Sequence, residues 1–177
     1  MPPVFRVIQL PSIRTFHLLH QALQYAFGWK NYHLYEFQVG RQRVAEPDPD
    51  RTERPRPLDP RTTRLGDLVV SGNRRFTYVY DFGDYWVHDI AVEQRFQQDP
   101  AARYPVCLEG ARACPPEDSG GPGGYETFLD AWRDPKHEDH EDMRKWAGSR
   151  FDPERCDLKA INKAVERLRG PAAPVRP

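Results

Sequence analysis

Residues 81–119 hold the densest group of side chains that could bind a metal ion or transfer a proton. They come from three stretches, D-F-G-D-Y-W-V-H, Y-P-V-C-L-E-G and A-C-P-P-E-D-S-G-G. The side chains of interest are Asp81, Asp84, His88, Cys107, Cys114, Glu117 and Asp118. Zn²⁺ binds imidazole, thiolate and carboxylate groups, usually four at a time, so this set of side chains could form a zinc site.

The candidate metal ligands are His88, Cys107 and Cys114, and Asp118 could complete the set. Glu117 would then be the general base of a metal-dependent, hydrolase-like enzyme. However, the two cysteines are separated by six residues and no C-x-x-C pair occurs, so the spacing is not that of a zinc finger. We favour the alternative of a hydrogen-bonded core histidine and two small buried cysteines. No cofactor is therefore expected, with Zn²⁺ as the alternative.

The C-P-P-E-D-S-G-G loop from Cys114 to Gly121 combines stiffness with tight turning. Prolines fix φ in its first half, and glycines permit positive φ in its second half. Such a loop could present its acids to a metal ion, a basic peptide or a proton, or Asp118 could simply cap a turn before the next helix. The candidate binding residues are Asp81, Asp84, Trp86, Glu117 and Asp118.

Several strands and helices must position these residues. Strands are expected at 4–10, 33–39, 75–81, 85–96 and 104–108, and helices at 16–27, 65–70 (one turn), 125–133, 138–147 and 158–168. The strands at 75–81 and 85–96 are expected to form a hairpin. Its second strand carries His88, and we expect it to adjoin the strand that ends near Cys107, which would bring the candidate ligands together.

The charge balance argues against a general polyanion-binding protein. The 177 residues include 26 Lys plus Arg and 26 Asp plus Glu, so the formal net charge is zero. Residues 41–64 are rich in proline and arginine and poor in apolar residues, and we expect an exposed loop there. DNA binding through Arg51 to Arg64 and through Arg74 and Arg75 is a weaker hypothesis, because acidic residues interleave with these arginines. A disordered tail is expected at 169–177.

The sequence also indicates a compartment. It contains neither a long apolar run nor a basic N-terminal stretch followed by an apolar one, so we expect a cytoplasmic protein, or a nuclear one in a eukaryote. Three cysteines do not match a secreted disulfide framework.

Five stretches are more specific in combination than any single residue. They are A-F-G-W-K-N-Y-H-L-Y-E-F (26–37), Y-D-F-G-D-Y-W-V-H (80–88), Y-P-V-C-L-E-G-A-R-A-C-P-P-E-D (104–118), G-G-Y-E (123–126) and F-D-P-E (151–154). Together they resemble the plasmid pRiA4b ORF-3-like family. The resemblance implies an α+β fold over residues 3–168, a single compact domain whose curved, mainly antiparallel sheet is packed by one N-terminal helix and a C-terminal helical segment.

Two departures from the family pattern affect these expectations. Family members usually begin with a further strand, so an exposed edge here could pair with another copy of the chain. The family loop often reads C-P-P-E-D-C-G-G, whereas this chain has Ser119, so a three-cysteine metal site does not carry over.

The resemblance implies an association with mobile genetic elements, since family members occur on plasmids and beside transposases. It implies no particular biochemical activity. Our first hypothesis is a non-catalytic binding or accessory module that holds a protein partner in the groove beside residues 81–84 and the 109–124 loop. Exposed aromatic residues would supply contact area. The candidates are Trp29, Tyr32, Tyr35, Tyr85 and Trp86. The metal-dependent enzyme is the alternative hypothesis.

Overall fold

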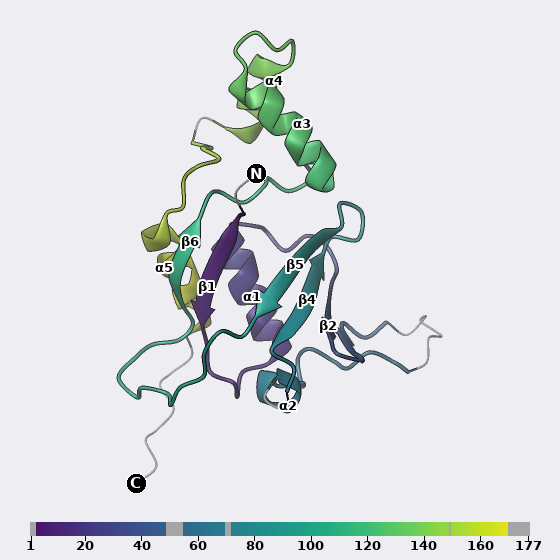
Figure 1. Cartoon of the computed structure of the whole chain (residues 1–177), viewed down its shortest axis with the longest axis vertical. Helices are drawn as coiled ribbons and strands as arrows, with labels where there is room; N and C mark the ends of the chain where they lie inside the picture. The colour runs from purple at the N-terminus through teal and green to yellow at the C-terminus, as the bar shows by residue number, and fades with distance from the viewer. Residues whose placement is uncertain (1–2, 49–54, 70–71, 149, 170–177) are drawn as a thin grey trace.

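The structure is a computed structural model that describes residues 3–48, 55–69, 72–148 and 150–169 (Figure 1). Its elements, in chain order, are β1 (Phe5–Gln9), α1 (Phe16–Phe27), β2 (Tyr35–Val39), β3 (Gln42–Ala45), α2 (Leu65–Val69), β4 (Arg75–Tyr80), β5 (Trp86–Ala91), β6 (Val106–Ala111), α3 (Gly121–Arg133), α4 (His140–Ala147), α5 (Leu158–Val165) and the short 3₁₀ helix η1 (Glu166–Leu168).

The strands form two antiparallel sheets, which confirms the predicted α+β class. One sheet has four strands in the order β3-β2-β4-β5, and the other pairs β1 with β6. Both sheets have α1 on one side, while α3 and α4 extend away from them (Figure 1). The expected pairing of the strand carrying His88 with the strand carrying Cys107 is wrong, because β6 pairs with β1 instead of β5.

Helix α1 has the bounds that the sequence predicts, and local chemistry explains them. The Thr15 hydroxyl accepts a hydrogen bond from the Leu18 amide at 3.3 Å, so it caps the first turn. Gly28 ends the helix with φ +79°, a left-handed conformation that glycine adopts without a steric penalty. The apolar face of the helix, which includes Phe16 and Leu23, is buried against the four-stranded sheet.

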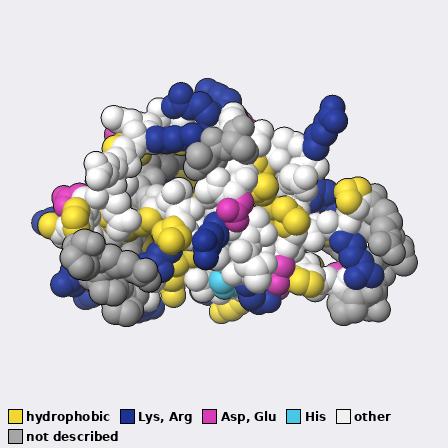
Figure 2. All heavy atoms as spheres, turned by 90° about the horizontal axis from the view of Figure 1, so that it is seen from below, with side chains coloured by type: hydrophobic (Ala, Val, Ile, Leu, Met, Phe, Trp, Pro, Cys, Tyr) yellow, Lys and Arg dark blue, Asp and Glu magenta, His cyan; other side chains and the backbone are white. Residues whose placement is uncertain are grey.

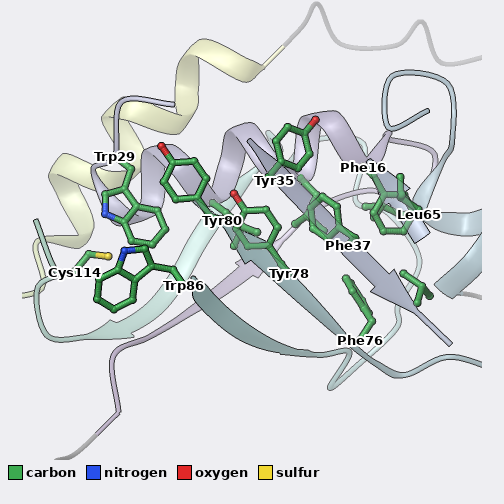
Figure 3. Close-up of a cluster of buried hydrophobic side chains, with 14 of the residues drawn as sticks. Phe16, Trp29, Tyr35, Phe37, Leu65, Phe76, Tyr78, Tyr80, Trp86 and Cys114 are labelled. Atoms are coloured by element: carbon green, nitrogen blue, oxygen red, sulfur yellow. The ribbon is translucent and has the colours of Figure 1, made fainter. Parts of the chain in front are cut away.

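Aromatic rings fill most of the space between α1 and this sheet (Figure 3). The Phe37 ring lies 4.7 Å from that of Tyr78 and 5.1 Å from that of Phe16, between ring centroids. Inward-facing residues alternate along β2 and β4, as they do in strands with one buried face. The core therefore holds the strands that lead to the β4–β5 turn in a fixed register.

A smaller core lies between the two-stranded sheet and α5. Ile161 and Val165 of α5 pack on Ala26 of α1 and on Cys107 of β6. The Asn162 side chain accepts a hydrogen bond from the Cys107 amide at 2.9 Å and donates one to the Cys107 carbonyl at 2.8 Å. This side-chain amide therefore pairs with β6 as a neighbouring strand would.

Segment 41–64 differs in part from the expected exposed loop. Gln42–Ala45 form β3, in which Val44 is fully buried, and Leu58 returns to pair with this strand. Two adjacent apolar residues in β3 suffice to extend the sheet, although the composition around them is typical of a loop. Residues 49–54 lie outside the described part of the chain.

The ends of the predicted elements differ by a few residues at other places. Helix α3 begins at Gly121 instead of residue 125, with Pro122 in its first turn. Proline is tolerated there because amides of the first turn have no hydrogen-bond partner within the helix. Of the predicted tail, residues 170–177 lie outside the described residues, whereas Arg169 donates to the Pro105 carbonyl at 3.2 Å. Among the described helices, none is long and apolar enough to cross a membrane.

Candidate functional site

The loop from Cys114 to Gly120 between β6 and α3, which we call the acidic loop, packs against the β4–β5 turn. Trp29 donates its indole N–H to the Pro115 carbonyl at 2.9 Å, and the Gly120 amide donates to Asp84 Oδ2 at 3.1 Å. At Gly121, φ is +68° and a Cβ atom would clash with the Asp84 carbonyl oxygen. Glycine is therefore required for this close approach, and the loop is held in one position.

Glu117, the general base of the alternative hypothesis, holds this loop on the sheet through both of its carboxylate oxygens. Its Oε1 accepts a hydrogen bond from the Tyr80 hydroxyl at 2.7 Å, and its Oε2 accepts one from the Lys30 backbone amide at 3.1 Å. Burial, together with this hydrogen bond to a carboxylate, raises the pKa of Tyr80 well above its usual value. Both carboxylate oxygens are occupied, so Glu117 positions the loop on the sheet.

Asp81 begins the β4–β5 turn with a positive φ of +58°. Its Oδ1 accepts the Gly83 amide at 2.8 Å, and its own amide donates to the Leu34 carbonyl at 2.9 Å. The side chain is only 10 % exposed. Asp81 therefore has a fixed orientation, with Oδ2 directed toward the segment that precedes β2.

His33 lies between Asp81 and Asp118. Its Nε2 is 3.5 Å from Asp81 Oδ2 and 3.2 Å from Asp118 Oδ1. The sequence analysis identifies both aspartates but not this histidine, which lies 48 positions before Asp81 at the start of an expected strand. The pairing of β2 with β4 brings His33 close to Asp81, and the hydrogen bonds of Glu117 to Tyr80 and Lys30 bring Asp118 close to both. These contacts cannot be inferred from positions in the sequence.

Four large apolar or aromatic side chains are exposed around this cluster. They are Tyr32, Leu34, Phe82 and Tyr85, with exposed fractions of 69, 58, 41 and 59 %. Hydrogen bonds fix the segments that carry two of them, because the Tyr32 amide donates to the Tyr80 hydroxyl and the Tyr85 amide donates to the Asp81 carbonyl. We call these four residues with His33, Asp81, Asp84 and Asp118 the sheet-end surface.

The other predicted contact aromatics belong to the core. Trp29, Tyr35 and Trp86 are at most 9 % exposed. Trp86 and Trp29 nevertheless line a pocket of about 240 Å³ together with Tyr125, beside the acidic loop. The residues that line this pocket do not include the 81–84 turn, so the predicted groove beside residues 81–84 and the 109–124 loop stays a prediction.

The predicted metal ligands do not come together. His88 Nδ1 lies 3.1 and 3.2 Å from the carbonyl oxygens of Trp86 and Tyr78, and burial lowers the pKa of the imidazole. His88 and Cys114 both line the pocket, but Cys107 faces α5 in the smaller core, because β6 pairs with β1.

Burial raises the pKa of both cysteine thiols. Cys107 and Cys114 are both buried free thiols. Within the described residues, the group whose possible ligand atoms all lie within 4.8 Å of one another is His33, Asp81 and Asp118. The alternative ligand set of His88, Cys107, Cys114 and Asp118 is therefore not brought together in this structure.

The arginines of the DNA hypothesis are dispersed. Arg74 donates to the carbonyl oxygens of Val92 and Glu93, and Arg61 pairs with Glu46 at 2.9 Å. Arg51 and Arg54 lie outside the described residues. On the face shown in Figure 2, Lys and Arg side chains are spread among other types and form no single patch.

Comparisons with known proteins give a consistent result. Residues 1–160 match the sequence profile of a family described as "Plasmid pRiA4b ORF-3-like protein". The chain is 40 % identical over 171 residues to "Uncharacterized protein y4hQ" of Sinorhizobium fredii, a match that covers 94 % of this chain and 86 % of that protein. It is also similar to the crystal structure of the protein of unknown function MM3350 from Methanosarcina mazei, with a TM-score of 0.81, 35 % identity and coverage of 90 and 89 % of the two chains.

Proposed function

Because this chain belongs to the plasmid pRiA4b ORF-3-like family, we propose that it is a non-catalytic accessory protein of a mobile genetic element, and that it works by binding a protein partner in the cytoplasm. The family description supports the link to a mobile element, since it refers to a plasmid reading frame. The sheet-end surface is the proposed binding site.

The observation that carries this proposal is the exposure of aromatic side chains on a rigid support. Tyr32, Phe82 and Tyr85 project around a turn that the acidic loop, the 30–34 segment and β4 hold by hydrogen bonds. Aromatic residues dominate the energetics of protein interfaces, and contact groups that are already ordered lose little entropy on binding. A surface of this kind suits a protein ligand.

The charge of the surface indicates the chemistry of the partner. Asp84 and Asp118 belong to the sheet-end surface, and Glu117 precedes Asp118 in the acidic loop. The basic residue Lys30 lies beside them, where its backbone amide donates to Glu117. A partner segment with Lys or Arg beside an apolar side chain would complement both the acids and the exposed rings. We therefore infer a basic, partly apolar segment of another protein as the ligand.

Comparative affinity capture tests this function. Wild-type protein and the Tyr85→Ala and Asp118→Ala variants serve as baits in cells that naturally carry the gene, with Trp146→Ala as a control. Trp146 is 48 % exposed on α4, away from the sheet-end surface. The proposal predicts a partner retained by wild type and control and depleted at least fivefold by both site variants. Equal recovery with all four baits would contradict it.

A further inference from the structure

The geometry points to a divalent transition-metal site made by His33, Asp81 and Asp118, with Zn²⁺ as the best-suited ion. These residues come from the segment before β2, the β4–β5 turn and the acidic loop. One imidazole nitrogen and two carboxylates form a ligand set that such ions accept. This inference concerns the chain alone and does not rest on the proposed partner.

The first observation is the spacing of the possible ligand atoms. Two atoms that each lie about 2.1 Å from a tetrahedral zinc ion are separated by about 3.4 Å. The distances from His33 Nε2 to Asp118 Oδ1 and Asp81 Oδ2 are 3.2 and 3.5 Å. All three atoms lie within 4.8 Å of one another, so they can surround one ion.

The second observation is independent and concerns the hydrogen bonding of His33. Its Nε2 has almost no contact with solvent and makes no hydrogen bond, although two carboxylate oxygens lie nearby. A buried nitrogen without a hydrogen bond lowers the stability of the folded state, and such atoms are rare in folded proteins. An ion between the nitrogen and the two oxygens would satisfy all three atoms.

The surroundings of the cluster hold its ligands in place. The Gly83 amide donates a hydrogen bond to Asp81 Oδ1, which leaves Oδ2 for an ion. The His33 ring packs edge-on against the Tyr80 ring, with 5.8 Å between the ring centroids. Outer contacts of this type orient metal ligands. The Asp118 side chain is 69 % exposed, so the remaining coordination positions of the ion would face solvent.

Zn²⁺ titration by calorimetry tests the site, using the full chain purified without a histidine tag. The variants are His33→Ala and Asp118→Asn, with His137→Ala as the matched control, because His137 also lies near a carboxylate, that of Asp139 at 3.8 Å. Asp118 is exposed, so Asp118→Asn preserves the fold even if His33→Ala does not.

The inference predicts one Zn²⁺ per chain, an affinity reduced at least tenfold in each site variant, and an unchanged affinity in the control. Absence of saturable binding in the wild type, or wild-type affinity in Asp118→Asn, would overturn it. Co²⁺ provides a second measurement, since thiolate ligands produce an intense sulfur-to-cobalt absorption and this site predicts none. Partner capture can fail while zinc binding persists, so the two proposals are tested separately.

Discussion

His20 is a fully buried polar residue in the aromatic core. Its Nδ1 lies 2.8 Å from the Tyr78 hydroxyl, its Nε2 lies 2.7 Å from Asn31 Oδ1, and its ring stacks on that of Tyr35 at 3.6 Å. Burial lowers the pKa of this imidazole to about 4. The neutral form therefore belongs to the folded state, and protonation favours unfolding.

The His20 environment predicts a loss of stability in mild acid. The pKa is lower in the folded state than the usual 6.5, so the stabilisation is present above pH 6.5 and is lost as the pH falls toward 4. Between pH 6.5 and about pH 5, His20 should reduce the free energy of unfolding by about 2 kcal/mol. Urea unfolding of wild type and His20→Gln at several pH values measures this effect. An equally steep loss in the variant would assign the pH dependence to other groups.

At the scale of elements, Asn162 attaches α5 to the free edge of β6. It forms hydrogen bonds with both the amide and the carbonyl of Cys107. The Asn162→Ala change leaves these backbone groups without partners, so we expect a loss of about 1–2 kcal/mol in the free energy of unfolding, after allowing for the better helix propensity of alanine. Lys163→Ala, at an exposed neighbouring position, should have little effect. Denaturant unfolding that finds the two variants equally stable would contradict this role.

The elements also show which features a sequence can predict. Helix α1 was predictable with its bounds, because its cap, apolar face and terminal glycine are all local signals. The β4–β5 hairpin was predictable for the same reason. Strand β3 was missed, because only two adjacent apolar residues distinguish it from the surrounding loop composition.

The residues of the candidate site also differ in whether local sequence signals predict them. Asp81 and Asp118 were predictable from their dense local motifs, whereas His33 was not, because only tertiary structure brings it to them. The zinc ligands of the alternative hypothesis do not come together, and the reason is topological. Strand β6 belongs to a second sheet with β1, which places Cys107 in a different core from His88.

At the scale of the whole molecule, one side chain joins the two-stranded sheet to the first helix. Arg6 of β1 donates to the carbonyl oxygens of Ala26 in α1, at 3.0 Å, and Ala111 in β6, at 2.9 Å. Arg6 therefore connects the two-stranded sheet to α1, the helix that also packs on the four-stranded sheet. Helices α3 and α4 extend away from the sheets, and the sheet-end surface lies where the acidic loop leads into α3 (Figure 1).

The predicted pairing of an exposed strand edge with a second copy of the chain stays a prediction. The four-stranded sheet has edges at β3 and β5, and in the two-stranded sheet β1, the N-terminal strand of the prediction, pairs only with β6 and has a second edge without a partner strand among the described residues. An edge of this kind can pair with another chain unless other residues cover it.

Site-specific photo-cross-linking tests the central claim most directly, namely that the sheet-end surface is where a partner binds. A photoreactive phenylalanine replaces Tyr85 in one protein and Trp146 in another, and both are irradiated in the native host. We predict a discrete adduct with a second polypeptide from position 85, lost when Asp118→Ala is added, and none of that mass from position 146. The same adduct from both positions, or an adduct from 146 alone, would contradict the claim.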